Sequence, residues 1–532
     1  VDSFNSDGFS INFRDEVNSN GRTYASWTFA KQEKFFDIVT YTGTGSETPV
    51  SHNLNSVPGM VIIKRTDSTG DWYVGHRGTG SYYLSSQLVL NSTAAGATNG
   101  VFGAAFTSTQ ITPSGNADIS GATYVAYLFA HNDGDGEFGE SGDQDIIKCG
   151  SVTGTAEEDL GFEPQWVLLK KTDGTGSNWR IMDNMRGMVV GGNDSQLFPD
   201  SSAAEFTSAD MITPTATGFS QTLSGTWIYI AIRRGPMKTP ESGTEVFDAY
   251  TASATSTNQV LGSVPHDLVW AKQRTETNNS FLWDRMRGNR RLITESTAAE
   301  DSTIYVGFDQ SNGTRVTSGI GANPVYALFR RAPGFFDVVA YDGNATAGRT
   351  VSHNLGVAPE FMIVKCRSNT GPDWAIYYGD PTDYLKFTSA ATADAADYWN
   401  DTAPTESVFT LGNKSDVNGS GRTYIAYLFA TLPGISKVGS YTGNGSSQTI
   451  DCGFSAGARF VLIKRTDSTG DWHVYDSERG IVAGNDPRLE LNTNNAEDTG
   501  SDDIDPVSSG FAVTSNADVN TNGATYAFLA IA

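Results

Sequence analysis

The sequence repeats itself with a period of about 100 residues, and this periodicity constrains the fold more than any other feature. Its clearest marker is an apolar segment that begins with Gly and carries Tyr three positions later. The marker reads GRTYASWTFA at 21–30, GATYVAYLFA at 121–130, GRTYIAYLFA at 421–430 and GATYAFLAIA at 523–532. A period of this length is that of a small domain and exceeds the repeats of solenoids and propeller blades. We therefore expect a row of similar small domains.

Further markers recur in a fixed order within each period. Each period opens with a strand-like segment such as FFDIVTYTGTG at 35–45. A turn followed by Pro and an apolar segment comes next, as VSHNLNSVPGMVIIK at 50–64 and VSHNLGVAPEFMIVK at 351–365. A polar turn that ends on Trp follows, and the nonapeptide KRTDSTGDW occurs twice, at 64–72 and at 464–472.

The markers predict five complete repeats and a partial one. Repeats 1 to 5, of which repeat 3 is divergent, span residues 35–131, 145–236, 245–332, 333–431 and 434–532. We expect an acidic, Gly-rich linker at 132–144 and a Pro-containing linker at 237–244. Residues 1–34 carry only the last markers. They are expected to be the C-terminal half of a truncated repeat, in a chain that is the C-terminal part of a longer protein.

The segments between turns are typical of β-strands. They are short, rich in β-branched and aromatic residues, and bounded by Gly, Asn and Pro. TYVAYLF at 123–129 is apolar at nearly every position, as in a central strand buried on both faces. No 3.6-residue periodicity extends beyond about two turns. We therefore predict an all-β chain, a tandem array of antiparallel β-sandwich (jelly-roll-like) domains that stack as a stiff rod.

The charge and the cysteines exclude several function classes. The chain has 60 acidic and 36 basic residues and a net charge of −24, which disfavours nucleic-acid binding. No apolar run is long enough to predict membrane insertion. Cys149, Cys366 and Cys452 are far apart and form no CxxC motif, so neither a disulfide framework nor a zinc site is predicted.

No motif of catalysis is present in the sequence. We find no GxSxG, HExxH, P-loop or dinucleotide-binding pattern, so we expect no catalytic residue, no cofactor and no enzymatic activity. Acidic turns leave Ca²⁺ open as a ligand. Asp67 and Asp71 flank one such turn, and Asp133, Asp135 and Glu137 alternate as in a calcium loop. The bidentate Glu that completes such a loop is missing, so no specific metal site is predicted.

Aromatic residues at the repeated positions are interpreted as structural. A Trp that recurs at the end of the polar turn fits a core or hairpin-base role better than sugar stacking. The repeated positions are Trp72, Trp179, Trp283, Trp374, Trp472 and, in the last marker, Tyr24, Tyr124, Tyr424 and Tyr526.

Aromatic residues outside the repeat pattern are the candidates for ligand binding. They lie in the variable middle of their repeats, where we expect exposed loops. The alternative is that such exposed aromatic residues mark contacts between subunits. The candidates are Tyr82, Tyr83, Tyr377, Tyr378, Tyr384 and Trp399.

The order of the markers resembles one family. The pattern is Y-T-G-x-G, then S-H-N-L-G-x-x-P, then D-x-x-x-x-W, then G-x-x-Y-x-A. It resembles a tandem domain of uncharacterised function that recurs in predicted tail-fibre and virion structural proteins of marine tailed phages, cyanophages especially. The resemblance covers nearly the whole chain and is strongest in repeats 1, 4 and 5, whereas repeat 3 lacks the SHNL turn. The family offers no catalytic residues to carry over.

The resemblance implies a virion structural protein, in a tail fibre or another surface appendage, assembled in the host cytoplasm. It would contribute to host attachment, where weak contacts gain avidity from several copies. By analogy with phage fibres we expect a homo-oligomer, with a trimer favoured. Other virion structural proteins and a host cell-surface glycan are the expected partners. Two alternatives stay open: carbohydrate-binding adhesin modules at a fibre tip or bacterial surface, and a capsid or neck decoration protein.

Overall fold

The structure, a computed structural model, describes residues 1–532 apart from 7, 80–86, 97–99, 156, 175, 253–258, 304, 318–319 and 322. The predicted fold class is confirmed, because the chain forms antiparallel sheets and its helices are single turns. The helical turns are α1 (Asp15–Asn18), α2 (Ala396–Trp399), α3 (Ser415–Asn418), α4 (Ala517–Asn520), η1 (Arg77–Thr79), η2 (Gly115–Ala117) and η3 (Gly243–Glu245). No helix of the described residues is long and apolar enough to cross a membrane.

Each repeat contains a large sheet that packs against a smaller one. The large sheet places the last strand of the repeat, here called the closing strand, between its first and third strands. In repeat 1 the large sheet runs β3 (Phe36–Thr42), β10 (Thr123–Phe129), β5 (Met60–Arg65), β6 (Trp72–His76), β7 (Leu88–Val89), and the small one β4 (Val50–Ser51), β9 (Gln110–Pro113), β8 (Phe102–Ala104). In repeat 2 they run β11 (Ile147–Thr153), β19 (Thr226–Arg233), β13 (Pro164–Lys171), β14 (Arg180–Asp183), and β12 (Glu157–Asp159), β18 (Gly218–Gln221), β17 (Ile212–Pro214), beside a pair β15 (Asp194–Gln196) and β16 (Phe206–Ala209).

The other three repeats follow the same order. Repeat 3 has β20 (Phe247–Thr251), β27 (Pro324–Phe329), β22 (Leu268–Gln273), β23 (Ser280–Asp284), β24 (Arg291–Ile293), and β21 (Gln259–Leu261), β26 (Thr314–Val316), β25 (Val306–Gly307). Repeat 4 has β28 (Phe336–Asp342), β35 (Thr423–Phe429), β30 (Phe361–Cys366), β31 (Ala375–Tyr377), β32 (Asp383–Lys386), β33 (Ala393–Asp394), and β29 (Arg349–Ser352), β34 (Val408–Leu411). Repeat 5 has β36 (Ser436–Thr442), β43 (Thr525–Ile531), β38 (Phe460–Arg465), β39 (Trp472–Asp476), β40 (Leu489–Glu490), and β37 (Gln448–Asp451), β42 (Gly510–Val513), β41 (Ile504–Val507). Residues 1–34 contribute the pair β1 (Ser3–Asn5) and β2 (Gly8–Ser10).

The closing strand is buried on both faces, which explains why its sequence does not alternate. In β35, Tyr424 and Leu428 point into the sandwich of repeat 4 and are fully buried there. Tyr427 and Phe429 point to the opposite face and belong to another core. Successive side chains on a strand alternate between faces, so an all-apolar strand needs apolar partners on two sides.

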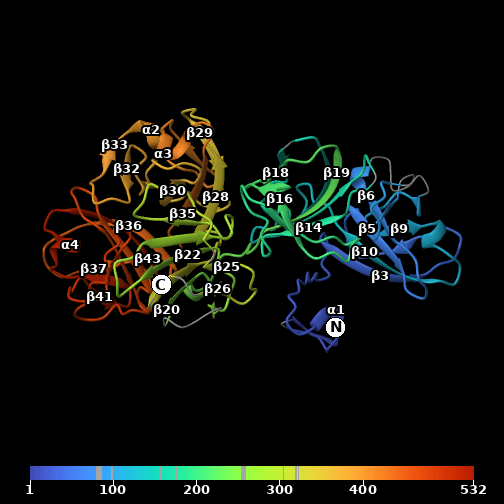
Figure 1. Cartoon of the computed structure of the whole chain (residues 1–532), viewed down its shortest axis with the longest axis horizontal. Helices are drawn as coiled ribbons and strands as arrows, with labels where there is room; N and C mark the ends of the chain where they lie inside the picture. The colour runs from blue at the N-terminus through green and yellow to red at the C-terminus, as the bar shows by residue number, and fades with distance from the viewer. Residues whose placement is uncertain are drawn as a thin grey trace.

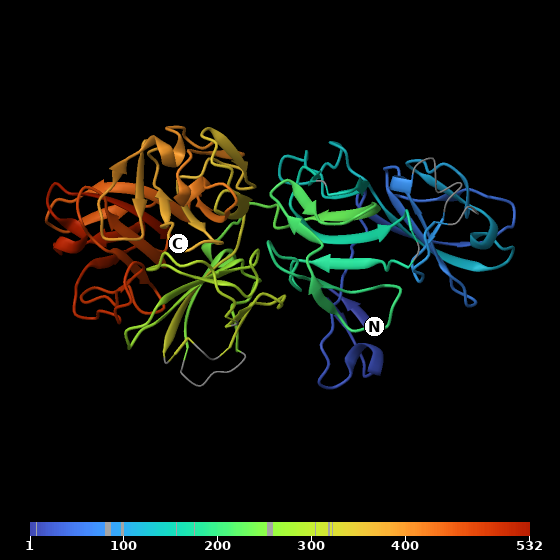
Figure 2. The ribbon, with the colours of Figure 1, turned by 45° about the horizontal axis from the view of Figure 1, so that its top comes forward.

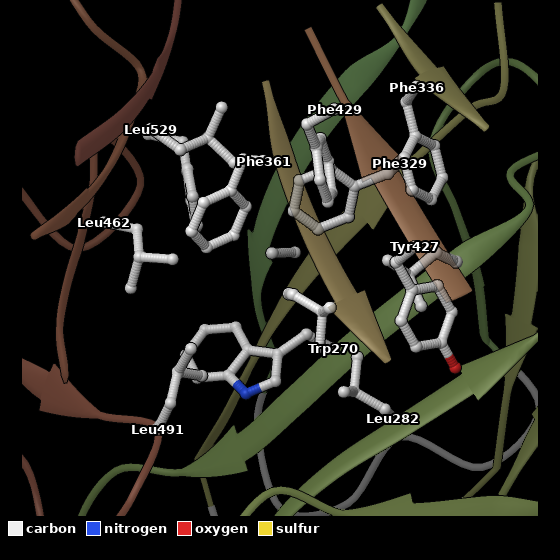
Figure 3. Close-up of a cluster of buried hydrophobic side chains, with 14 of the residues drawn as sticks. Trp270, Leu282, Phe329, Phe336, Phe361, Tyr427, Phe429, Leu462, Leu491 and Leu529 are labelled. Atoms are coloured by element: carbon white, nitrogen blue, oxygen red, sulfur yellow. The ribbon is translucent and has the colours of Figure 1, made fainter. Parts of the chain in front are cut away.

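The second face of each closing strand packs against other repeats. Repeats 3, 4 and 5 bury these faces in one shared core, seen in Figure 3, where Phe329, Phe429 and Leu529 converge from three closing strands. Repeats 1 and 2 share a separate core that also takes up Trp27 and Phe29. The molecule accordingly shows two lobes (Figures 1 and 2), with repeats 1 and 2 in one and repeats 3 to 5 in the other. The expected rod of stacked sandwiches is therefore wrong, because three repeats surround a common core.

Candidate functional site

The residues that recur in every repeat form the joints between sandwiches. The hairpin that joins the third and fourth strands of a repeat, here called the joint hairpin, holds a Lys opposite a Trp. The ammonium group lies over the indole ring in four repeats, at 5.6 Å for Lys64–Trp72, 5.8 Å for Lys170–Trp179, 5.8 Å for Lys365–Trp374 and 6.0 Å for Lys464–Trp472. A cation at this distance is attracted by the ring face.

The same Lys closes the turn of its hairpin. Lys365 Nζ donates to the carbonyl oxygen of Pro372 at 2.6 Å, and Lys170 Nζ donates to that of Ser177 at 2.6 Å. Lys464 Nζ donates in the same way to the carbonyl oxygen of Gly470. The Lys side chain, the polar turn and the Trp side chain thus form one structural unit, in which each part contacts the other two.

The Trp of the joint hairpin reaches across to the preceding repeat. Trp179 Nε1 donates to the carbonyl oxygen of Val89 at 2.9 Å, and Trp472 Nε1 to that of Lys386 at 2.9 Å. Trp374 Nε1 bonds Ile293 at 3.1 Å. The acceptors lie in β7, β32 and β24, which occupy the same position in their large sheets and are here called the outer strands. The joint hairpins of repeats 2, 4 and 5 therefore each dock on the outer strand of another repeat.

Main-chain hydrogen bonds reinforce each joint. Gly371 N donates to the carbonyl oxygen of Thr297 at 3.0 Å, which joins repeat 4 to repeat 3. Gly470 N donates to that of Ser389 at 2.8 Å, which joins repeat 5 to repeat 4. Gly371 adopts a φ of +114°, a conformation that favours glycine.

The joint hairpin of repeat 3 docks on repeat 5 and closes a ring. Asn278 N donates to the carbonyl oxygen of Asn494 at 2.9 Å, and Lys272 Nζ donates to that of Glu490 at 2.8 Å. Arg274 forms an ion pair with Glu497 at 2.8 Å. Repeat 4 thus docks on repeat 3, repeat 5 on repeat 4, and repeat 3 on repeat 5. We call this arrangement the C-terminal ring.

Repeat 3 departs from the expected Trp position. Strand pairing places Ser280, rather than Trp283, opposite Lys272. Trp283 lies on the other face of β23, in the core of its own sandwich, where its Nε1 donates to the carbonyl oxygen of Thr303 at 3.3 Å. Trp270 of the neighbouring strand supplies the indole to the shared core instead and bonds Ser280 Oγ at 2.6 Å. Assigning Trp283 to the repeated position was therefore wrong.

The lysines of the joint hairpins have lowered pKa values because they are buried. Burial lowers the pKa of Lys272, Lys365 and Lys464 to about 8 in each case, although nearby carboxylates oppose the shift. Main-chain carbonyl oxygens replace part of the lost hydration at all three ammonium groups, and an indole face does so at Lys365 and Lys464.

The repeated tyrosines pin a single helical turn to the closing strand. Tyr424 Oη accepts from Gly419 N at 2.6 Å and donates to the carbonyl oxygen of Ser415 at 2.7 Å, which ties α3 to β35. Tyr124, Tyr526 and Tyr24 each make a corresponding pair of bonds. The Tyr424 ring also stacks on Tyr341 with centroids 5.2 Å apart.

Four of the six aromatic residues singled out as ligand candidates are described by the structure, and none of these four is displayed for a ligand. Tyr82 and Tyr83 lie outside the described residues. Tyr377 and Trp399 are only 3% and 1% exposed, so the expectation that they project from loops is wrong. They fill the sandwich core of repeat 4.

The two remaining candidates are partly buried and already have partners. Tyr378 bonds Asp383 Oδ2 at 3.1 Å and Thr392 Oγ1 at 2.7 Å. The Tyr384 ring stacks on Tyr398 at 3.7 Å, which occupies one of its faces. Sequence variability in the middle of repeat 4 therefore reflects a locally different core rather than exposed loops.

A buried ion network at the junction of the two lobes was not anticipated from the sequence. Arg331 of repeat 3 bonds both carboxylate oxygens of Glu163 of repeat 2, and its Nε donates to Asp337 of repeat 4 at 2.8 Å. Arg234 lies 3.3 Å from the same Glu163. Burial alone would raise the pKa of Asp337, but Arg331 and Arg234 lower it. One signal was visible, because the closing strands of repeats 2 and 3 end in Arg-Arg where the others end in an apolar residue and Ala.

Three further features of the described residues bear on function: their acidic groups, their thiols and one cleft. Among them, no group of three or more His, Cys, Asp or Glu side chains is placed to hold a metal ion. Cys149, Cys366 and Cys452 are buried free thiols. An open cleft of about 450 Å³ lies between repeats 2 and 3, lined among others by Arg186, Arg287 and Arg315. The first two of these arginines are held by Asp183 and Asp284.

Comparison with known proteins places the chain in a family. The family model described as Domain of unknown function (DUF7483) matches residues 1–236 and 329–532. The unmatched stretch contains nearly all of the divergent repeat 3. No curated protein matches the chain. Because the match covers most of its length, the chain belongs to the family of this domain of unknown function.

Proposed function

We propose that the protein is a non-enzymatic structural protein of a tailed phage particle, a fibre or other surface appendage that contributes to host attachment. The phage assignment is supported by the order of sequence markers, which resembles predicted virion structural proteins. The structural role is supported by one observation above all: the recurring residues are used to join sandwiches into a ring.

The C-terminal ring bears on the homotrimer expected from the sequence. A homotrimer with closed symmetry places three equivalent surfaces around an axis, one from each chain. Here three repeats of one chain surround a common core, and we propose that this internal ring takes the place of the expected homotrimer. Contact with the host would then fall to loops other than those of Tyr377, Tyr378, Tyr384 and Trp399, whose rings are engaged internally.

The proposal is tested on particles of the phage that encodes the chain. Gold-labelled antibody raised against repeat 5 should bind the tail or its appendages in electron micrographs. Label on the capsid or neck would support the decoration alternative and overturn the appendage assignment. Absence of the chain from purified particles, measured by mass spectrometry, would overturn the structural role as well.

A further inference from the structure

We infer that repeats 1 and 2 are two of the three members of a second ring. The position of the third member, here called the vacant seat, binds a β-sandwich of this same repeat type, and residues 21–30 supply the closing strand of that sandwich. The joint between repeats 1 and 2 matches those of the C-terminal ring. Trp179 bonds the outer strand of repeat 1 through Val89, and Gly176 N donates to the carbonyl oxygen of Thr93 at 3.2 Å. A ring of three such joints requires two more, and each has one side already in place.

The two copies of KRTDSTGDW reveal the first vacant joint. Both hairpins make the same internal bonds, because Trp72 N bonds Asn91 Oδ1 at 2.9 Å and Trp472 N bonds Asn492 Oδ1 at 2.8 Å. Their surroundings differ. Trp472 is 1% exposed and bonds Lys386 of the neighbouring repeat, whereas Trp72 is only partly buried. Trp72 Nε1 forms no hydrogen bond with any residue that the structure describes.

Tyr127 marks the same vacancy from the closing strand of repeat 1. Its counterpart Tyr427 is fully buried and donates to Asp284 Oδ2 of the preceding repeat at 2.7 Å. Tyr127 is partly buried, stacks on Trp72 at 6.3 Å, and forms no hydrogen bond through its hydroxyl group to any described residue. The hairpin at 64–72 and Tyr127 thus present a surface shaped for the preceding member of a ring.

Residues 21–30 already occupy the vacant seat in part. Trp27 corresponds to Tyr427, and its Nε1 donates to Asp183 Oδ2 of repeat 2 at 3.1 Å, as Tyr427 does to Asp284. Phe29 corresponds to Phe429 and lies 5.6 Å from Phe129 and 5.9 Å from Trp166 between ring centroids. This segment therefore enters the core of repeats 1 and 2 as a closing strand does.

The residues before 21–30 form half of a sandwich, and the apolar face that would line the core of that sandwich is exposed. β1 pairs with β2 as β41 pairs with β42, and Tyr24 holds α1 as Tyr424 holds α3. Half of the large apolar side chains exposed among the described residues lie in this half: Val1, Phe4, Ile11, Phe13, Val17 and Tyr24. The counterparts of Val17, Val417 and Val519, are fully buried. Figure 1 shows α1 standing apart from the sheets.

The missing partner is therefore the complementary half-sandwich, the first five strands of a repeat of this family. It would pair with residues 22–30, which form no strand in the structure, and fill the open cleft of about 420 Å³ beside Trp27 and Phe29. It would also bring an outer strand to Trp72. A second copy of the chain has no such half to spare, because each described large sheet already pairs with its own closing strand.

A grafted chain tests the inference. Residues 333–420 of repeat 4 are placed before Gly21 in place of residues 1–20, at a junction where both sequences read GRTY. Hydrogen exchange is followed by mass spectrometry. We expect the amides of 23–30 and of 64–72 to be protected at least about 100-fold more than in the unmodified chain. Protection of 23–30 without any change at 64–72 would overturn the docking on Trp72.

Matched variants separate docking from folding of the graft. Trp72→Ala in the grafted chain should remove the added protection at 64–72 and keep that at 23–30. Trp472→Ala should leave both segments of the first lobe as they were. If the graft from repeat 4 does not fold, the corresponding graft of residues 434–522 from repeat 5 replaces it.

The unmodified chain supplies a test that needs no graft. We expect acrylamide to quench a fluorescence component that Trp72→Phe removes and that Trp472→Phe leaves in place. Equal protection of the two Trp residues in a monomer, as measured by sedimentation, would overturn the vacancy. A dimer that shields Trp72 and dissociates with Phe29→Asp would assign the seat to a second copy and overturn our choice of occupant.

Discussion

The twin nonapeptides allow one substitution to be made in two environments. Trp472→Ala removes a side chain that is 1% exposed, with about 150–250 Å² of surface that is buried on folding. At about 25 cal/mol per Å² the lower end of this range amounts to about 4 kcal/mol, to which the bond to Lys386 adds about 1 kcal/mol. Trp72→Ala removes the same side chain from a partly buried site without that bond. We expect it to cost about 2 kcal/mol.

Hydrogen exchange under increasing urea measures the two lobes separately. The difference of about 2 to 3 kcal/mol corresponds to at least about a 30-fold difference in the population of the opened lobe. The local sequence is identical over nine residues, so any difference reports the neighbouring repeat and not the hairpin. Equal losses for Trp72→Ala and Trp472→Ala would refute the reasoning, since the hairpin alone would then account for the stability.

Three further predictions concern charge and hydrogen bonding. Raising the pH from 8 to 9.5 should increase the free energy of unfolding of the C-terminal ring, because lysines of the unfolded chain hold their protons up to about pH 10.4 whereas Lys272, Lys365 and Lys464 lose theirs near pH 8. Lys464→Met should make this rise smaller in a denaturant titration, and an unchanged rise would contradict the role of Lys464. Arg331→Ala leaves Glu163 buried without its strongest partner and should cost about 3–5 kcal/mol in chemical denaturation, whereas Arg315→Ala, which breaks an exposed pair, should cost under about 1 kcal/mol. Tyr424→Phe loses both bonds to α3 and should cost about 1–2 kcal/mol, while Tyr24→Phe at its 47% exposed site should cost less; equal shifts in thermal denaturation would contradict the burial argument.

The sequence predicts the elements of each sandwich well, because they depend on local patterns. The apolar closing strand was expected to be buried on both faces, and β10 and β35 are central strands. What covers their second face could not be deduced, because the partner strands lie in other repeats. Apolar residues that face another repeat are indistinguishable in the sequence from residues that face the sandwich core.

The aromatic residues of repeat 4 show why variability is a poor guide to exposure. α2 lies in the stretch between β33 and β34, and its Tyr398 and Trp399 are buried. Tyr377 packs edge-on against Trp399 with ring centroids 5.8 Å apart. These residues differ from those of the other repeats because the core is built differently there. In repeat 3, likewise, the indole of the shared core comes from Trp270 on a neighbouring strand, which position counting cannot reveal.

Disulfide trapping tests most directly the claim that repeats 3, 4 and 5 close into a ring. Asn278 and Asn494 belong to repeats 3 and 5, and their main chains are joined by a hydrogen bond of 2.9 Å. A disulfide requires Cα atoms within about 7 Å, which a linear file of sandwiches would not allow across the whole of repeat 4. The chain carrying Asn278→Cys and Asn494→Cys should form an intramolecular disulfide under mild oxidation, detected by mass spectrometry of peptides from the monomer. Free thiols at both substituted positions of the oxidised monomer would contradict the ring.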